Sequence, residues 1–107
     1  MKKQEIRLSG SGGQGVILAA IILANAGVEQ GLNAIQTQSY GPEARGGASK
    51  AEVILSNDEI NYPKITKANI LLSLTQKAYD KYNSSLEEKG ILIIDESVKL
   101  SGDETFK

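Results

Sequence analysis

A glycine-rich segment, Gly-Ser-Gly-Gly-Gln-Gly at positions 10–15, constrains the fold more than any other part of this sequence. The stretch before it, Glu5 to Ser9, alternates apolar and polar residues, which predicts a strand. The stretch after it, Val16 to Ala24, is an unbroken run of nine apolar residues. That run is half of the roughly 18 residues that indicate a membrane span, so we predict a buried helix that ends at Gly27 or Gly31. A strand, a glycine-rich turn and a helix therefore open the chain.

The predicted first helix carries no charge, since no charged residue occurs between Arg7 and Glu29. A helix that is apolar all round normally has something packed on both sides of it. One side is its own sheet. The other is either a partner chain or the interior of this domain, and so small a chain favours the partner.

Strands and helical stretches alternate along the rest of the chain, which predicts one domain over residues 1–107. The expected fold is α/β, a three-layer sandwich with a mostly parallel or mixed sheet and a Rossmann-like first turn. Further strands are predicted at Leu32–Gln38, Ala48–Ser56, Asn69–Leu74 and Ile91–Asp95, with a brief edge segment at Ile60–Pro63, a helix capped by Thr75 that runs through Tyr82, and a helical turn over Ser84–Lys89.

Alternation within Ala48–Ser56 predicts a strand with one buried and one half-exposed face. The buried face is expected to hold Ala51, Val53 and Leu55. The half-exposed face is expected to hold Lys50, Glu52 and Ile54.

Composition removes several classes of function. The net charge is −1 and the pI is about 5.4, so the chain lacks the basic surface that nucleic-acid binding needs. There is no Cys and no His, hence no thiolate for an iron–sulfur cluster and no imidazole for zinc. We expect no metal site and no catalytic residue on this chain, no membrane association and a cytoplasmic location.

The glycine-rich turn, whose members are Gly10, Ser11, Gly12, Gly13, Gln14 and Gly15, suits a phosphate, because backbone N–H groups and a helix N-terminus can approach one there. A Rossmann dinucleotide site would add a carboxylate about 20 residues on, where Gln36-Thr37-Gln38 stands instead. A Walker-type ATP site would need a Gly-Lys-Ser/Thr ending, which is absent. Two interpretations stay open, a phosphate-binding turn and a tight turn that only permits close packing.

A second shaped loop, Ser39 to Gly47, contains three glycines and a proline in nine residues. Arg45 suits either a bidentate pair with a carboxylate or phosphate or an ion pair with a partner subunit. Tyr40 suits stacking on a ring, but an interface anchor is favoured; Glu43 suits acid–base chemistry, but a loop or interface carboxylate is favoured. The predicted interface residues are Tyr40, Gly41, Pro42, Glu43, Arg45, Gly46 and Gly47.

These two glycine-rich segments, in this order, resemble the gamma subunit of 2-oxoacid:ferredoxin oxidoreductases, and most of all that of the 2-oxoglutarate enzyme. The resemblance continues through the Tyr62-Pro63 pair and spans essentially residues 3 to 96. It implies an assembly that decarboxylates a 2-oxoacid on thiamine diphosphate, passes electrons through iron–sulfur clusters to ferredoxin and transfers the acyl group to coenzyme A. The expected partners are alpha, beta and ferredoxin-like delta subunits of a cytoplasmic hetero-oligomer.

Within such an assembly the resemblance implies a non-catalytic component that supports subunit contacts, with the glycine turn binding coenzyme A phosphates or packing against the thiamine-binding subunits. The alternative is a stand-alone nucleotide- or phosphate-binding module. Two departures from the family stand out. Its domain usually continues for several elements after the strand that corresponds to Ile91–Asp95, so a lone sample of this chain should oligomerise or aggregate, and Asn69 stands where an acidic residue is expected.

Overall fold

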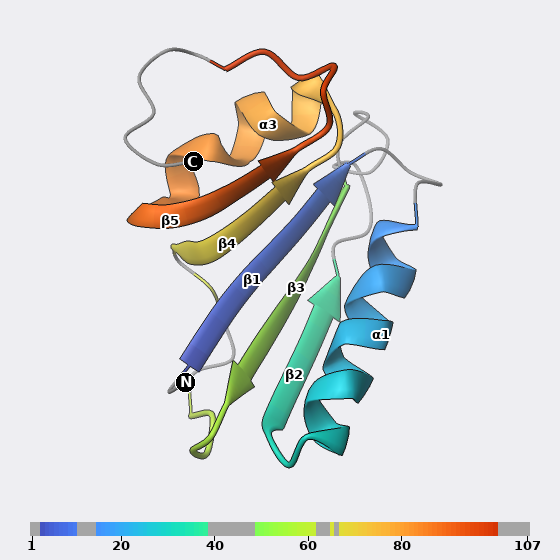
Figure 1. Ribbon diagram of the computed structural model, residues 1–107, viewed down its shortest axis with the longest axis vertical. Coiled ribbons are helices and arrows are strands. Elements are labelled where there is room, and N and C mark those ends of the chain that lie inside the picture. The colour runs from blue at the N-terminus through green and yellow to red at the C-terminus, as the bar shows by residue number, and fades with distance from the viewer. Residues whose placement is uncertain (1–2, 11–14, 39–48, 62–64, 66, 101–107) are drawn as a thin grey trace.

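A computed structural model describes residues 3–10, 15–38, 49–61, 65 and 67–100. Their regular elements follow one another in the order β1-α1-β2-β3-β4-α3-β5 (Figure 1). The strands are β1 (Lys3–Gly10), β2 (Asn33–Gln38), β3 (Ser49–Ser56), β4 (Ala68–Ser73) and β5 (Leu86–Ile94); the helices are α1 (Val16–Glu29) and α3 (Gln76–Tyr82), and a 3-10 turn spans Asn83–Ser85.

The five strands form a mixed sheet in the order β2-β3-β1-β4-β5. β1 is parallel to β4, β4 is parallel to β5, and only β3 runs antiparallel to its neighbours β1 and β2. The chain lays α1 on one face of this sheet and α3 on the other (Figure 1). The predicted α/β fold with a mostly parallel or mixed sheet is confirmed.

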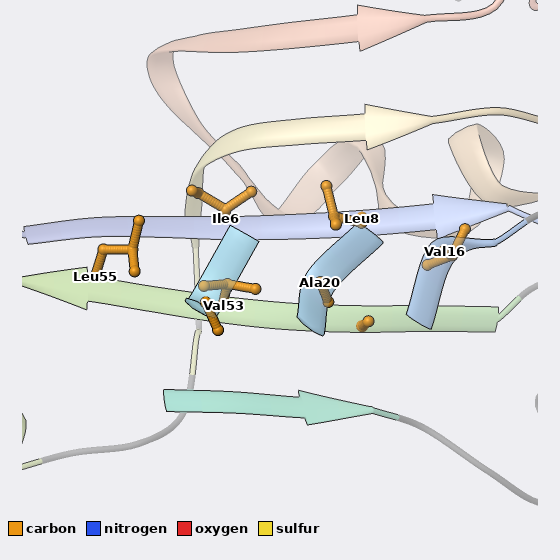
Figure 2. Packing of buried hydrophobic residues seen from close by; sticks show 8 residues of the cluster. Ile6, Leu8, Val16, Ala20, Val53 and Leu55 are labelled. Carbon is orange, nitrogen blue, oxygen red and sulfur yellow. The ribbon is translucent and has the colours of Figure 1, made fainter. Parts of the chain in front are cut away.

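The larger core lies between α1 and the centre of the sheet, where Ile6 and Leu8 of β1 and Val53 and Leu55 of β3 meet the small residues of the helix (Figure 2). Gly27 allows the closest approach, since a Cβ there would come within 2.5 Å of Leu55 Cδ2. The many alanines and this glycine therefore bring α1 down onto the sheet.

Gly27 is inside α1, so the helix ends at the other predicted residue, Gly31. Gly31 has φ +86°, a left-handed conformation, and its N–H donates to Val28 O at 2.9 Å. Leu32 N–H donates to Gly27 O at 3.0 Å. These two bonds form a Schellman motif, which satisfies carbonyls that the helix end would otherwise leave unpaired.

The opposite face holds a smaller core under α3, made of Leu71, Ala78, Tyr82 and Leu86. Thr75 caps α3 as predicted, its Oγ1 accepting a hydrogen bond from Ala78 N at 3.1 Å.

Arg7 of β1 lies on this second face and is only 4% exposed. Its Nε is 2.6 Å from Glu52 Oε2, and Nη2 donates to Ile65 O at 3.0 Å. Nη1 donates to Ser85 Oγ, and Arg7 Cζ lies 5.7 Å from the centre of the Tyr82 ring. A central strand thus carries a buried charge that is paired with one carboxylate and surrounded by neutral polar and aromatic contacts.

Three local predictions were wrong. Residues 86–89 of the predicted helical turn Ser84–Lys89 belong to β5, and only a 3-10 turn precedes them. Ile54, expected on a half-exposed face, is 2% exposed and packs against Ile65 and Ala68. Residues 60 and 61 form no strand, while the rest of that predicted edge segment lies outside the described residues.

Candidate functional site

The two described ends of the glycine-rich turn lie at the C-terminal end of β1. Gly10 closes β1 and pairs with Ser49, the first residue of β3. Gly15 is the N-cap residue of α1 and has φ +81°, which glycine adopts without steric cost. A Cβ on Gly15 would meet nothing within 4 Å, so backbone conformation rather than lack of space requires glycine there. Ser11, Gly12, Gly13 and Gln14 lie outside the described residues.

The second glycine-rich loop leaves and rejoins the sheet at the same end, the C-terminal end of β1. It follows Gln38, the last residue of β2, which pairs with Ala51, and it leads into Ser49 beside Gly10. The two segments that define the predicted site are therefore anchored next to each other, although 23 residues, 16–38, separate them in sequence. The predicted interface residues Tyr40, Gly41, Pro42, Glu43, Arg45, Gly46 and Gly47 lie outside the described part of the chain, and their roles stay predictions.

The C-terminal end of the sheet, where these two segments are anchored, contains a topological switch point between β1 and β4. From β1 the chain passes through α1 toward β2, and from β4 it passes through α3 toward β5 on the other side and the other face (Figure 1). Open α/β sheets bind ligands in the crevice that such a reversal leaves at the carboxyl ends of the strands. The glycine-rich turn follows one of the two strands that form it.

Two serines that sequence reasoning missed hold the strand ends together at the switch point. Ser9 Oγ donates to Leu72 O at 2.8 Å and lies 3.3 Å from Ser73 Oγ, and Leu74 N donates to Ser9 O at 3.0 Å. Both serines are fully buried. The available signal was a serine near the end of each of two apolar strands, just before a glycine or a helix cap. Their bonds fix the spacing of β1 and β4 where the crevice begins.

Asp95, predicted as the last residue of a strand, follows β5 at the same end of the sheet. Its carboxylate Oδ2 accepts hydrogen bonds from Ser97 N at 3.0 Å and Ser97 Oγ at 2.6 Å. The bond from the Ser97 side chain and, to a smaller extent, the bond from the Ser97 backbone hold the pKa of Asp95 below its usual value. Asp95 therefore carries a negative charge at neutral pH and closes a local turn.

Asn69, where an acidic residue was expected, has a structural contact. Its Oδ1 accepts a hydrogen bond from Glu5 N at 2.6 Å, joining the start of β4 to β1. An aspartate could accept the same bond, so the substitution keeps the contact and loses only a charge.

Among the residues that the structure describes, no three His, Cys, Asp or Glu side chains gather in a way that could hold a metal ion. No helix among those residues is both long and apolar enough to pass through a bilayer.

Residues 5–106 match the family model described as pyruvate ferredoxin/flavodoxin oxidoreductase. The chain belongs to this family. The resemblance expected from the two glycine-rich segments is thereby confirmed, and it covers nearly every residue of the chain.

Within this family the chain is similar to proteins named 2-oxoglutarate synthase subunit KorC. It is 54% identical over 97 residues to the protein from Methanocaldococcus jannaschii, covering 90% of this chain and 52% of that one. It is 47% identical over 97 residues to the protein from Archaeoglobus fulgidus, covering 91% of this chain and 52% of that one. The chain thus spans about half the length of the curated relatives it matches.

Solved structures give the same fold. A keto/oxoacid ferredoxin oxidoreductase gamma subunit from Geobacter sulfurreducens superposes with a TM-score of 0.86 at 46% identity, covering 99% of this chain and 58% of that chain. A 2-oxoglutarate:ferredoxin oxidoreductase from Magnetococcus marinus, solved with 2-oxoglutarate, coenzyme A and succinyl-CoA bound, gives a TM-score of 0.83 at 21% identity, covering 98% of this chain and 18% of that chain. The second likeness concerns the fold alone.

Proposed function

We propose that this chain is the non-catalytic gamma component of a multisubunit 2-oxoacid:ferredoxin oxidoreductase whose substrate is 2-oxoglutarate. The observation that carries the proposal is the identity of about one half to proteins named as 2-oxoglutarate synthase subunits. Proteins named as ketoisovalerate oxidoreductase subunits are less similar, at 31% identity for the one from Methanothermobacter thermautotrophicus. The same comparisons do not favour a stand-alone nucleotide-binding module.

The residue inventory supports a non-catalytic part. The sequence holds no Cys to ligate an iron–sulfur cluster and no His to act as a base. Thiamine diphosphate and the clusters would be held by alpha, beta and delta subunits, and electrons would leave those chains for ferredoxin. This chain would contribute a contact surface at the C-terminal ends of β1 and β2, where the two glycine-rich segments are anchored.

We assign the other subunits to this surface. Gly10 and Ser49 bring the two glycine-rich segments together, and the segment 39–47 offers Tyr40, Glu43 and Arg45 for contacts with a partner. Aromatic side chains and arginine are the usual anchors of subunit interfaces. The partner-facing loop would therefore be adjacent to the glycine-rich turn.

We further propose that the turn contributes to the coenzyme A surface. The left-handed Gly15 opens α1 without a side-chain cap, and the turn adjoins the switch point between β1 and β4. Backbone N–H groups in such a turn suit the phosphates of coenzyme A. No residue of the chain is proposed to touch the reacting carbon.

Reconstitution tests both parts. Alpha, beta and delta subunits should reduce ferredoxin with 2-oxoglutarate and coenzyme A only when this chain is added, and this chain should be inactive alone. If the other subunits turn over equally well without it, its role as a component is refuted.

The coenzyme A part has its own readout. Gly12→Val is expected to raise the KM for coenzyme A at least tenfold with an unchanged KM for 2-oxoglutarate, while Glu87→Ala, at an exposed position of the far edge strand β5, leaves both unchanged. An unchanged KM for coenzyme A in Gly12→Val would confine the turn to a packing role.

A further inference from the structure

The outer side of α1 is an exposed apolar surface next to an uncharged sheet edge. Leu18, Ile22 and Val28 are 60%, 59% and 58% exposed, and Ile21 lies beside them. With Ile21 included, they leave roughly 400 Å² of apolar side chain in water, within the size range of patches that mark interaction sites. The sequence predicted a partner for this helix without saying which.

The neighbouring edge is β2. In the part of the chain that the structure describes, β2 pairs only with β3 and forms one edge of the sheet. Edge strands are usually protected by charges, prolines or bulges. β5, at the other edge, has such devices: Glu87, Glu88 and Lys89 are exposed, and its pairing with β4 is shifted there. β2 has none, because Asn-Ala-Ile-Gln-Thr-Gln contains neither charge nor proline.

From the geometry we infer that β2 and α1 form the contact between two copies of this chain. A two-fold axis would pair β2 with β2 of the second copy in antiparallel fashion and place the two α1 helices side by side on one face of a continuous sheet. In such a contact each residue faces the same surface of its partner. A charged surface would therefore face its own like charges and be repelled. This surface avoids that repulsion, because residues 16–42 contain a single charged residue, Glu29.

The packing of α1 within one copy sets the distance between the helices. α1 packs mainly on β3, with β2 on one side and β1 on the other; Gly27 lies over Leu55, and the half-buried Ala34 of β2 packs against the same core. Strands are about 4.8 Å apart, so a second β2 at the edge puts the two helix axes about 12 to 14 Å apart. A helix with its side chains is about 10 to 12 Å across, so long side chains, such as the exposed leucine and isoleucines, are the ones that would reach across.

The point where the two-fold axis crosses β2 also follows from the contact of Gly27 with Leu55 and from the pairing of β2 with β3. The middle of α1, near Ile22, lies about 7 Å back along the helix from Gly27, which corresponds to about two residues along β3. Two residues before Leu55 is Val53, and Val53 pairs with Gln36 of β2. An axis through Gln36 therefore overlaps the two helices along their whole length.

This axis also places the charge favourably. The helices run antiparallel, so Glu29 of one copy would lie near the N-terminus of α1 of the other, where negative charge is stabilised. The first turn of α1 carries no acidic residue of its own that would repel it.

Cysteine cross-linking tests the contact without interference, because the sequence contains no cysteine. Single cysteines at Ile35, Gln36 and Thr37 are tested in the full chain and in the assembled complex. Residues that face each other across an antiparallel pair have Cα atoms about 4.5 to 5.5 Å apart, within the range of a disulfide. Oxidation of at least one of these variants, with Gln36→Cys favoured, should convert most of the sample to a species of twice 11.4 kDa.

Two controls separate this contact from random collision. Asn33→Cys is exposed on the same strand, but its copies would be about 20 Å apart across the axis. Ile93→Cys is exposed on the opposite edge. Both should stay uncross-linked.

Ile22→Lys should turn a dimer into a monomer in analytical ultracentrifugation, with an unchanged circular dichroism spectrum, while Ile91→Lys should leave the dimer intact. Cross-linking at Asn33 or Ile93 as readily as at Gln36, cross-linking only to another subunit, or a monomeric parent chain would each overturn the inference. The reconstitution experiment reports on the proposed function independently of these results.

Discussion

Replacing Glu52 with leucine is expected to destabilise the protein more than any other change at a partly exposed position. Arg7, 4% exposed, would keep its charge while losing the carboxylate oxygen 2.6 Å from its Nε. Its remaining contacts, the Ile65 carbonyl, the Ser85 hydroxyl and the Tyr82 ring, carry no negative charge. Removing one partner of a buried ion pair costs about 3–5 kcal/mol. Domains of this kind have about 5–15 kcal/mol of stability in total.

The partner variant should behave differently. In Arg7→Met, Glu52 retains Lys50, whose Nζ is 3.5 Å from the same oxygen. Replacing both members of a buried pair with apolar residues is often close to neutral. We therefore expect the double variant Arg7→Met/Glu52→Leu to be more stable than Glu52→Leu alone by about 2 kcal/mol or more.

Urea denaturation at one fixed protein concentration, followed by far-UV circular dichroism, measures these differences. With a slope of roughly 1.5–2 kcal/mol per M, Glu52→Leu should lower the midpoint by about 2 M. A midpoint equal to that of the parent chain, or a double variant less stable than Glu52→Leu, would show that the buried guanidinium does not depend on this carboxylate.

Three further predictions concern packing, capping and pH. Gly27→Ala places a Cβ 2.5 Å from Leu55 Cδ2, so the end of the Leu55 side chain must shift. The cost of overpacking, about 1 kcal/mol or more, should offset the gain of about 1 kcal/mol in helix propensity, and Tm should not rise; in a Leu55→Ala background the same change should be stabilising. Thr75→Ala removes the α3 cap and should cost about 1 kcal/mol in thermal denaturation, whereas Thr75→Ser should not. NMR titration should give Asp95 a pKa below 3.8, and Ser97→Ala should raise it toward that value. Because the folded pKa is the lower one, this turn stabilises the fold above about pH 3.8 and its contribution is lost as pH falls through the folded pKa.

Local signals in the sequence predicted most of the fold correctly. The nine apolar residues from Val16 gave α1, Gly31 ended it through its left-handed conformation, and Thr75 marked the start of α3. In each case one chemical requirement, a glycine conformation or a capping hydroxyl, is fulfilled by residues close in sequence.

Predictions failed where distant contacts decided the outcome. The residues Leu-Glu-Glu-Lys at 86–89 favour a helix, yet Leu86 pairs with Ala68 and Lys89 adopts φ +67° so that β5 can extend. Ile54 seemed half-exposed because its neighbours on that face, Lys50 and Glu52, are charged. In the structure Glu52 pairs with the buried Arg7, and Lys50 lies over the Tyr82 ring. The periodicity of the sequence does not reveal such contacts between distant residues.

The candidate site was predictable in its composition but not in its arrangement. Glycine spacing indicated the turn at residues 10–15 and the loop at 39–47, while their common anchoring at Gly10 and Ser49 depends on β3 running antiparallel to β1. The serine contact between Ser9 and Ser73 required the β1–β4 pairing to be known.

Affinity purification of the tagged chain from its native host shows whether the chain is a component of a 2-oxoglutarate:ferredoxin oxidoreductase. We expect thiamine-binding and Cys-rich subunits to be recovered in stoichiometric amounts, together with thiamine diphosphate, iron and 2-oxoglutarate-dependent reduction of ferredoxin. Recovery of the chain without those subunits, or with subunits that oxidise no 2-oxoacid, would contradict the account.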